Sequence, residues 1–264
     1  MTGSSGFLLS KWYLDCVAED GTTFIGYAAL LRWKLLSLHF SNILLRRPNE
    51  GTKTESSLTS HDAPQRDGSS IRWTHRAFSV EGNWTGLSNP INRQLYKDED
   101  GEIVWSCLLP MARATIRIGN TPAIEGLGYV EHLSLSLLPW KLPITELRWG
   151  RFLMNAGSLI WIDWRGPVRK RLVLHNGEEV DDATITDFEI QGSGGRRLSL
   201  LPEAVVRNGS LLSSTLSGIP GIVNMFPAGI LRTHECKWLS RGNFELNHSC
   251  AGEGWAIHEL VKFK

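Results

Sequence analysis

Apolar, aromatic and β-branched residues gather in runs of six or seven positions along the chain. Leu159–Trp164 reads Leu-Ile-Trp-Ile-Asp-Trp, and Thr184–Ile190 reads Thr-Ile-Thr-Asp-Phe-Glu-Ile. Residues of these types favour strands, and helical signals are weak. Ala28–Leu45 has the length of a helix, but its Trp, His, Phe and Ser content fits paired strands equally well. The pattern therefore predicts an all-β protein.

Turn signals between these runs predict antiparallel pairing. Asp20-Gly21, Asp100-Gly101 and Asn176-Gly177 each lie between runs of strand character. Such dipeptides suit type I′ turns, which need positive φ at both central residues. Arg241-Gly242-Asn243 is predicted to form a fourth turn.

Two polar segments and one proline-rich segment divide the chain further. Arg46–Ser70 is rich in Ser, Thr, Gly, Pro and charge, which predicts a long mobile loop that is either a lid or disordered. Gln191–Arg197 is predicted to be a second exposed loop. Pro139–Pro143 interrupts the strand pattern, so we place a boundary between domains at residues 1–139 and 140–264. No internal repeat is visible.

Composition limits the class of partner. The chain has 264 residues, 42% of them hydrophobic, which is enough for a sizeable core. Its net charge of +1 argues against nucleic acid or an anionic membrane as the main partner. The most apolar stretch, Phe24–Phe40, is broken by Arg32 and Lys34, so no membrane span is expected. A basic cluster is predicted to be a solvated turn: Arg165, Arg169, Lys170 and Arg171.

The cysteines indicate a cellular compartment, and the tryptophans indicate a class of ligand. The four cysteines have no C-x-x-C spacing and no signal peptide pattern precedes them, so we expect reduced thiols in a cytoplasmic protein. The 11 tryptophans favour a large core or a cavity for a sizeable apolar ligand. For each single tryptophan, plain core packing is the simpler explanation.

Glu131 is the strongest candidate for chemistry. It lies in the strand-like stretch Gly126–His132, next to an imidazole. If Tyr129, Glu131 and Leu133 line the inside of a sheet, Glu131 is a carboxyl group among apolar groups and resists ionisation. A neutral acid at pH 7 can deliver a proton to a substrate. The alternative is a carboxylate paired with a neighbouring arginine in a structural network.

Two further Glu/His neighbours occur, His234-Glu235 and His258-Glu259. Both faces of Trp255–Val261 are apolar apart from the ionisable residue, so that residue needs a buried partner. Near the start of the chain, Tyr13 and Asp15 share one face of a predicted strand. Asp15 has the alternative role of a turn cap or a partner of a basic side chain.

Other site chemistries have less support. Two histidines and a carboxylate can bind iron or zinc, but here they would come from distant strands without a local spacing rule, so we expect no metal. No spacing supports Cys107 or Cys236 as a nucleophile, and the Gly-x-Ser-x-Gly motif of serine hydrolases is absent.

Three short stretches resemble one family. Gly128–His132 is similar to the G-Y-x-D-H motif of carotenoid 1,2-hydratases (hydroxyneurosporene synthases), and Leu147–Phe152 resembles the W-G-R segment that follows it there. Trp12–Asp15 resembles the W-Y-x-D entry of the same superfamily. That superfamily also includes tocopherol cyclase-like proteins and fungal Diels–Alderase-type cyclases. The resemblance lies within the first 152 residues.

The resemblance implies two lipocalin-like (calycin-like) antiparallel β-barrel or sandwich domains, with an apolar ligand between or inside them. It also implies an acid at the fourth motif position, which protonates a carbon–carbon double bond in the hydratases. Glu131 replaces aspartate at that position here, which moves the carboxyl group by about one C–C bond. Because proton delivery is sensitive to such a shift, the replacement leaves the role of the acid open and the hydratase reaction does not follow from the resemblance alone. The chain is also shorter than a typical hydratase of that family, so a different and smaller substrate is expected.

Together these observations predict a cofactor-independent cyclase or hydratase that acts on an apolar unsaturated terpenoid or polyketide intermediate. Glu131 would be the general acid or hydrogen-bond donor, and His132, His258 and Glu259 would tune it or shuttle the proton. Seven residues are expected to contact the substrate: Tyr13, Asp15, Tyr129, Trp149, Trp161, His234 and Trp255.

Two alternatives need the same pocket. A non-catalytic lipocalin-type carrier would bind an apolar ligand without using Glu131. A pericyclase that works by shape alone would depend on the cavity and little on the acid. The sequence does not identify the substrate, its stereochemistry or the oligomeric state.

Overall fold

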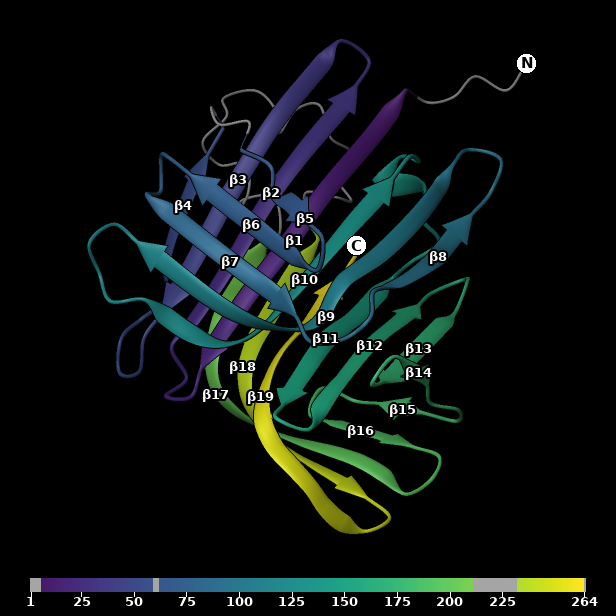
Figure 1. Cartoon of the computed structure of the whole chain (residues 1–264). Coiled ribbons are helices and arrows are strands. Elements are labelled where there is room, and N and C mark those ends of the chain that lie inside the picture. Colours follow the sequence, from purple (N-terminus) through teal and green to yellow (C-terminus); the bar gives the residue numbers. More distant parts are fainter. Residues whose placement is uncertain (1–5, 59–61, 211–231, 264) are drawn as a thin grey trace. The chain divides into compact units, whose positions relative to one another are not determined.

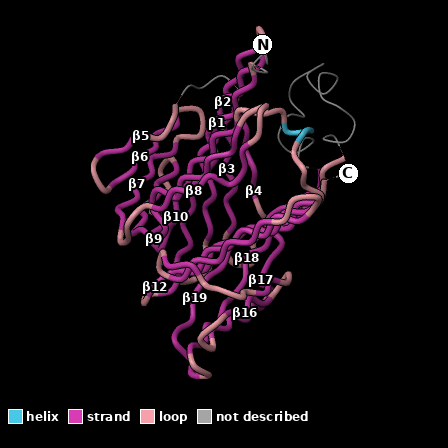
Figure 2. The backbone as a smooth tube through the Cα atoms, turned by 90° about the vertical axis from the view of Figure 1, so that its right-hand side faces the viewer, coloured by secondary structure: helices cyan, strands magenta, loops and turns pink. Residues whose placement is uncertain are grey.

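A computed structural model describes residues 6–58, 62–210 and 232–263. Its regular structure in these ranges is β-strand, apart from the 3₁₀ turn η1 (Pro139–Lys141), which confirms the all-β prediction. Figure 2 shows strand along most of the described backbone. The chain divides into two compact units, Met1–Leu138 (unit 1) and Pro139–Lys264 (unit 2). No described helix is long and apolar enough to cross a membrane.

Unit 1 is one antiparallel sheet. Over the described residues its strand order is β4-β3-β2-β1-β10-β9-β7-β6-β5, and β8 pairs with β9 (Figure 1). The strands are β1 (Phe7–Ala18), β2 (Thr23–Trp33), β3 (Leu36–Arg46), β4 (Lys53–Ser57), β5 (Gln65–Asp67), β6 (Ser70–His75), β7 (Val80–Gly86), β8 (Ile91–Lys97), β9 (Glu102–Ile118) and β10 (Ile124–Leu135).

Unit 2 is a second antiparallel sheet. Over the described residues its order is β14-β13-β12-β11-β19-β18-β17-β16-β15. The strands are β11 (Glu146–Met154), β12 (Gly157–Arg165), β13 (Lys170–His175), β14 (Glu178–Glu179), β15 (Thr184–Ile185), β16 (Glu189–Gly192), β17 (Arg196–Ser210), β18 (His234–Leu246) and β19 (Ser249–Lys262).

The two units repeat one topology. In each, the first strand of the unit pairs with the last, as β1 with β10 and β11 with β19, and three further strands follow in sequence order on one side. Each curled sheet is a lipocalin-like half-barrel, so the expected fold class is confirmed. The repeat is invisible in the sequence because strand pairing constrains the alternation of side chains and not their identity.

Each sheet has an apolar core on one face. In unit 1 the even-numbered residues Leu14 and Cys16 of β1 and Val130 of β10 belong to this core, together with Trp73 and Trp84. In unit 2 the core includes Phe152, Trp161, Phe244 and Ala256. Since neighbouring strand residues face opposite sides, the odd-numbered residues of β1, β10, β11 and β19 lie on the face away from each core.

The structure refines the predicted turns. Asn176 and Gly177 both have positive φ, 53° and 88°, as a type I′ turn requires. At Asp20-Gly21 and Asp100-Gly101, only the glycine of each pair has positive φ. The type I′ prediction is therefore right for one of the three dipeptides.

The fourth predicted turn, Arg241–Asn243, is wrong, because these residues lie inside β18. The chain turns instead at Asn247 and His248, whose φ values are 51° and 62°. Packing explains the glycine at position 242, because a Cβ atom there would lie 2.5 Å from Cε2 of Phe152.

Both predicted loops are also corrected. Arg46–Ser70 contains β4, β5 and the first residue of β6, while residues 59–61 lie outside the described residues. These strands were hidden because they lie at sheet edges and are polar on both faces, with β5 fully exposed. Gln191–Arg197 is a hairpin between β16 and β17, turning at Gly194 and Gly195 with φ of 68° and 63°.

The basic cluster around Gly166-Pro167 is more than a solvated turn. Arg165 Nη2 lies 2.6 Å from Asp163 Oδ2, and Arg171 Nε lies 3.5 Å from Asp163 Oδ1. Asp163 is buried, so its charge requires these partners. Arg165 lies two residues after Asp163 on β12, whereas Arg171 is its register partner on β13, which a local sequence pattern does not show.

Gly242→Ala should destabilise the protein by about 1–3 kcal/mol, because the added methyl group overlaps the Phe152 ring. Urea unfolding followed by circular dichroism measures the change. Gly51→Ala is the matched control, since nothing lies within 4 Å of its new Cβ atom. Equal stability of the two variants would contradict this packing role.

Candidate active site

Pairing of β1 with β10 brings four of the predicted site residues onto one face. Tyr13 lies opposite Glu131, and Asp15 lies opposite Tyr129. This face is the one away from the apolar core of unit 1, to which Val130 belongs. The sequence suggested that apolar core side chains surround Glu131. The structure instead places Glu131 in a cluster of polar and aromatic side chains.

Glu131 accepts two hydrogen bonds at one oxygen. Tyr129 Oη donates to Glu131 Oε2 at 2.6 Å, and Trp105 Nε1 donates to the same oxygen at 2.5 Å. Trp105 reaches it from β9, where Cys107 is the register partner of Glu131. Both donors are uncharged. These two hydrogen bonds therefore differ from the ion pair with an arginine that was the alternative role of Glu131.

The supporting side chains are fully buried, whereas Glu131 is half-buried. Trp105 is 1% exposed, and Tyr129 and Cys107 are 0% exposed. Burial raises the pKa of the Tyr129 hydroxyl and of the Cys107 thiol well above their usual values. Both groups are therefore protonated at neutral pH, and Tyr129 remains a hydrogen-bond donor.

Three of the four tyrosines of the chain contact one another at this site. The Tyr13 ring centroid lies 5.4 Å from that of Tyr27 and 6.0 Å from that of Tyr129, in edge-on arrangements. The Lys11 ammonium group lies 5.1 Å from the Tyr27 ring centroid. The cluster thus combines the carboxyl groups of Glu131 and Asp15, which both add to the effect of burial in raising the pKa of the Cys107 thiol, with a wall of aromatic rings (the Glu131 cluster: Tyr13, Asp15, Tyr27, Trp105, Cys107, Tyr129 and Glu131).

His132 lies on the opposite face from Glu131. Its Nε2 is 2.8 Å from Ser10 Oγ, and its ring centroid is 5.0 Å from that of Trp12, which packs on the apolar core. Burial lowers the pKa of His132, so the imidazole is neutral at pH 7. Adjacent positions in the sequence therefore do not give an acid–imidazole pair here.

In unit 2, Trp161 and His258 lie on the core face. His258 Nε2 is 2.8 Å from Ser240 Oγ, and its ring stacks on Trp238 with centroids 5.2 Å apart. The Trp161 ring centroid is 6.2 Å from that of His258. Burial, with a further contribution from Lys237, lowers the pKa of His258 to about 3, so it is neutral at pH 7.

Trp149, Trp255 and Glu259 lie on the face of unit 2 away from its core. Glu259 forms an ion pair with Lys237, whose ammonium group lies 5.3 Å from the Trp149 ring centroid. The Arg241 guanidinium group lies 3.8 Å from the Trp255 ring centroid. His234, the first residue of β18, is exposed.

Sequence reasoning missed the roles of Trp105 and Lys237. Trp105 lies in a segment of β9 whose residues are alternately buried and partly exposed. Such alternation predicts on which face Trp105 lies, but it does not show that β9 pairs with β10. Lys237 is 1% exposed, although lysine is rarely buried. No local signal distinguishes it from a surface lysine.

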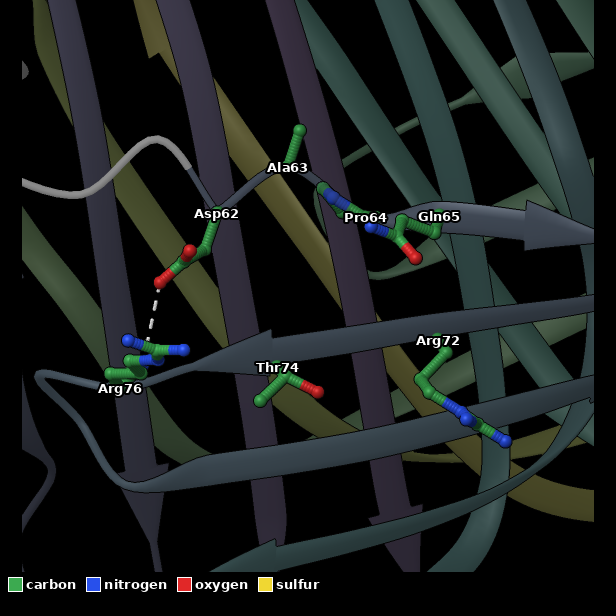
Figure 3. Close-up of a pocket in the computed structure, with 7 residues that line it drawn as sticks. All are labelled: Asp62, Ala63, Pro64, Gln65, Arg72, Thr74 and Arg76. Atoms are coloured by element: carbon green, nitrogen blue, oxygen red, sulfur yellow. Dashed lines mark hydrogen bonds between the residues drawn. The ribbon is translucent and has the colours of Figure 1, made fainter.

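Two hollows of about 400 Å³ lie elsewhere, and neither is lined by Glu131. One is formed by Asp62–Gln65 with Arg72, Thr74 and Arg76, and Figure 3 shows the Arg72 side chain extending away from Asp62. The other lies in unit 2 and is lined by Arg148, Arg165 and Ile185–Glu189. Among the described residues, no group of three or more His, Cys, Asp and Glu side chains is placed to hold a metal ion.

Comparison with known proteins identifies the fold. No protein-family model and no curated protein matches the sequence. Among solved structures, CghA with Sch210972 aligns with a TM-score of 0.62 and 11% identity over 97% of this chain and 89% of its own. Kievitone hydratase from Nectria haematococca aligns with a TM-score of 0.57 and 8% identity, over 98% and 89% of the two chains.

A protein provisionally assigned as AttH from Nitrosomonas europaea aligns with a TM-score of 0.57 and 11% identity, over 96% of this chain and 92% of its own. All three alignments span both units. At such low identities they establish the shared fold, which is the two-unit lipocalin-like fold that the sequence resemblance implied.

The buried His258 should make stability depend on pH. Its folded pKa of about 3 lies below the ordinary value of 6.5, so the unfolded chain binds the proton more readily. Its stabilising contribution is complete above pH 6.5 and falls by about 1.4 kcal/mol per unit as pH falls towards 3. Between pH 7 and pH 5, His258→Asn should therefore lose about 2 kcal/mol less stability than the wild type.

Urea unfolding at the two pH values measures this difference. His234→Asn is the control, because His234 is exposed and its replacement should leave the wild-type pH dependence unchanged. The same pH dependence in His258→Asn as in the wild type would show that His258 is not the group responsible.

Proposed function

We propose that the protein is an enzyme, a cyclase or hydratase acting on an apolar unsaturated terpenoid or polyketide intermediate, with Glu131 as general acid or hydrogen-bond donor. The observation that carries this proposal is the Glu131 cluster, in which a half-buried carboxyl group is held by two fully buried donors. The fold shared with kievitone hydratase, and with CghA solved with Sch210972, supports the reaction class.

In this proposal the two donors favour one arrangement of the proton on Glu131. Trp105 Nε1 is a donor only, so Oε2 must accept from it. In protonated Glu131, Oε2 is then the carbonyl oxygen and the hydroxyl proton lies on Oε1. That proton is the one offered to the substrate.

The same donors stabilise the product of proton transfer. When Oε1 gives its proton to a substrate double bond, negative charge develops on the carboxylate, and Trp105 and Tyr129 already point at Oε2. Donors that are in place before the reaction need no reorganisation. A positioned general acid contributes about 10²–10⁴-fold to the rate.

The aromatic wall suits the intermediate that protonation creates. Adding a proton to a carbon–carbon double bond leaves a carbocation, which the π-faces of Tyr13, Tyr27 and Tyr129 attract. A cyclase would then lose a proton from carbon, and a hydratase would add water and lose a proton from its oxygen. Glu131 takes up one proton from solvent to complete the cycle.

His132 and His258 have modest roles in this proposal. Both imidazoles are neutral at pH 7 and are bonded to Ser10 and Ser240 respectively, so we assign them no proton shuttle. The chemistry needs no organic cofactor. A cytoplasmic location is also proposed, supported by the four cysteines, all of them described, which form no disulfide bond.

Glu131→Gln should abolish turnover while binding persists. Glutamine keeps an acceptor for Trp105 and Tyr129 but has no acidic proton, so conversion should fall by at least about 10²-fold. Wild type and variant are incubated with a panel of polyenes, conversion is followed by mass spectrometry, and the fold is checked by circular dichroism. Glu125→Gln, an exposed position on β10, is the matched control and should convert at the wild-type rate.

The other outcomes of this experiment identify the alternatives. Equal conversion by wild type and Glu131→Gln would indicate a pericyclase that works by shape. Binding without conversion in the wild type would indicate a carrier.

Trp105→Phe should lower kcat by about 10²-fold, because it removes one donor from Glu131 Oε2 while keeping an aromatic ring. Trp73→Phe is the control: Trp73 is equally buried and donates to the Asp62 carbonyl oxygen, away from the Glu131 cluster. It should lower stability and leave kcat unchanged. A similar kcat in both variants would remove Trp105 from the proposed mechanism.

A further inference from the structure

Unit 2 carries a glutamate at the position that corresponds to Glu131. Glu131 of β10 lies opposite Tyr13 of β1 and Cys107 of β9. Glu259 of β19 lies opposite Trp149 of β11 and Lys237 of β18. In each unit the glutamate therefore lies on the last strand, on the face away from the apolar core, facing an aromatic residue of the first strand.

A glycine five residues before each glutamate supports this correspondence. A Cβ atom at Gly126 would overlap the carbonyl oxygen of Val17, and one at Gly254 would overlap that of Leu153. Both carbonyl groups belong to the strand that pairs with the glutamate strand. The two close approaches fix the same register in the two units.

The support beneath the two carboxyl groups differs in charge. Glu131 has the neutral donors Trp105 and Tyr129. Glu259 pairs with the ammonium group of Lys237, which also lies 3.5 Å from Glu235 Oε1. Unit 2 thus places a buried ammonium group beside its glutamate, where unit 1 places an indole and a phenol.

The exposures of the ionic group show which member faces outward. The Lys237 side chain is 1% exposed, that of Glu235 is 3% exposed, and that of Arg207, 3.5 Å from Glu235, is 12% exposed. Glu259 is the most exposed of the four, at 16%. As with Glu131, the carboxyl group reaches out from a support that is almost fully buried.

We propose that Glu259 is a second ligand-binding carboxylate, which Lys237 keeps ionised and which accepts a hydrogen bond from a hydroxyl group on an apolar ligand. An ionised carboxylate has four lone-pair sites, and Glu259 is the member of the ionic group that a ligand reaches most easily, since its side chain is 16% exposed. The Trp149 ring, which is 6% exposed, lies beside the same pair, 5.3 Å from the Lys237 ammonium group. The proposal concerns unit 2 alone and does not depend on catalysis by Glu131.

The first test asks whether Lys237 keeps Glu259 ionised. In Lys237→Met, Glu259 loses its closest cation, and burial penalises the charged form. Infrared spectra at pH 7 should then show a protonated carboxyl band in Lys237→Met that is absent from the wild type, from Lys237→Arg and from the double variant K237M/E259Q. Absence of the new band from Lys237→Met, or its presence in Lys237→Arg, would overturn the proposed role of Lys237.

A second comparison covers the case in which Lys237→Met does not fold. Glu259→Gln should remove carboxylate absorption from the wild-type spectrum. Removal of a protonated carboxyl band instead would overturn the proposal.

The ligand chemistry is tested with farnesol and farnesyl methyl ether, which differ in the hydroxyl donor. Wild type and Glu131→Gln should both bind farnesol about 10-fold more tightly than the ether, a difference of about 1.4 kcal/mol, because the ether has no hydroxyl group to donate to the carboxylate. The double variant K237M/E259M, which replaces the pair by apolar side chains of similar shape, should bind the two probes equally. Equal or undetectable binding of the probes by wild type, or a preference that survives in the double variant, would overturn the proposed site.

Discussion

The pairing of the first and last strands within each unit is the constraint on which the rest of the structure depends. It joins β1 to β10 and β11 to β19 across more than a hundred residues, as the bond between Ser10 and His132 illustrates. Gly126 and Gly254 permit the close backbone approach at one end of each pair. Once the register is fixed, every side chain on the two central strands is assigned to a face.

Both faces of these strands are buried, so polar side chains on them lose their contact with water and need hydrogen-bond partners within the protein. Tyr13, Asp15 and Tyr129 are almost fully buried although they lie away from the apolar core. Buried polar atoms need partners, so an indole and a phenol converge on the carboxyl group of Glu131. In the proposed reaction, the partners that satisfy the burial requirement would also orient the acid, so stability and chemistry would use the same contacts.

The duplicated topology presents one carboxyl position in two electrostatic settings. Neutral donors surround Glu131, whereas a buried ammonium group faces Glu259. The same type of side chain therefore meets hydrogen-bond donors in one unit and a cation in the other. The adjacent histidines add no charge beside either carboxyl group, because alternation places His132 and His258 on the opposite faces and burial keeps both neutral.

The sequence by itself determined the strand class, the Asn176-Gly177 turn and the shared face of Tyr13 and Asp15, because turn dihedrals and side-chain alternation are local properties. Its resemblance to a hydratase family also indicated the two-unit fold. Only the tertiary structure showed that Trp105 supports Glu131, that Lys237 pairs with Glu259, and that Gly242 accommodates Phe152. The first two contacts join paired strands and span 26 and 22 residues of the sequence, and the third joins Gly242 of β18 to Phe152 of β11 across the intervening strand β19. Alternation is encoded within a strand, but the choice of partner strand and its register depends on the whole sheet.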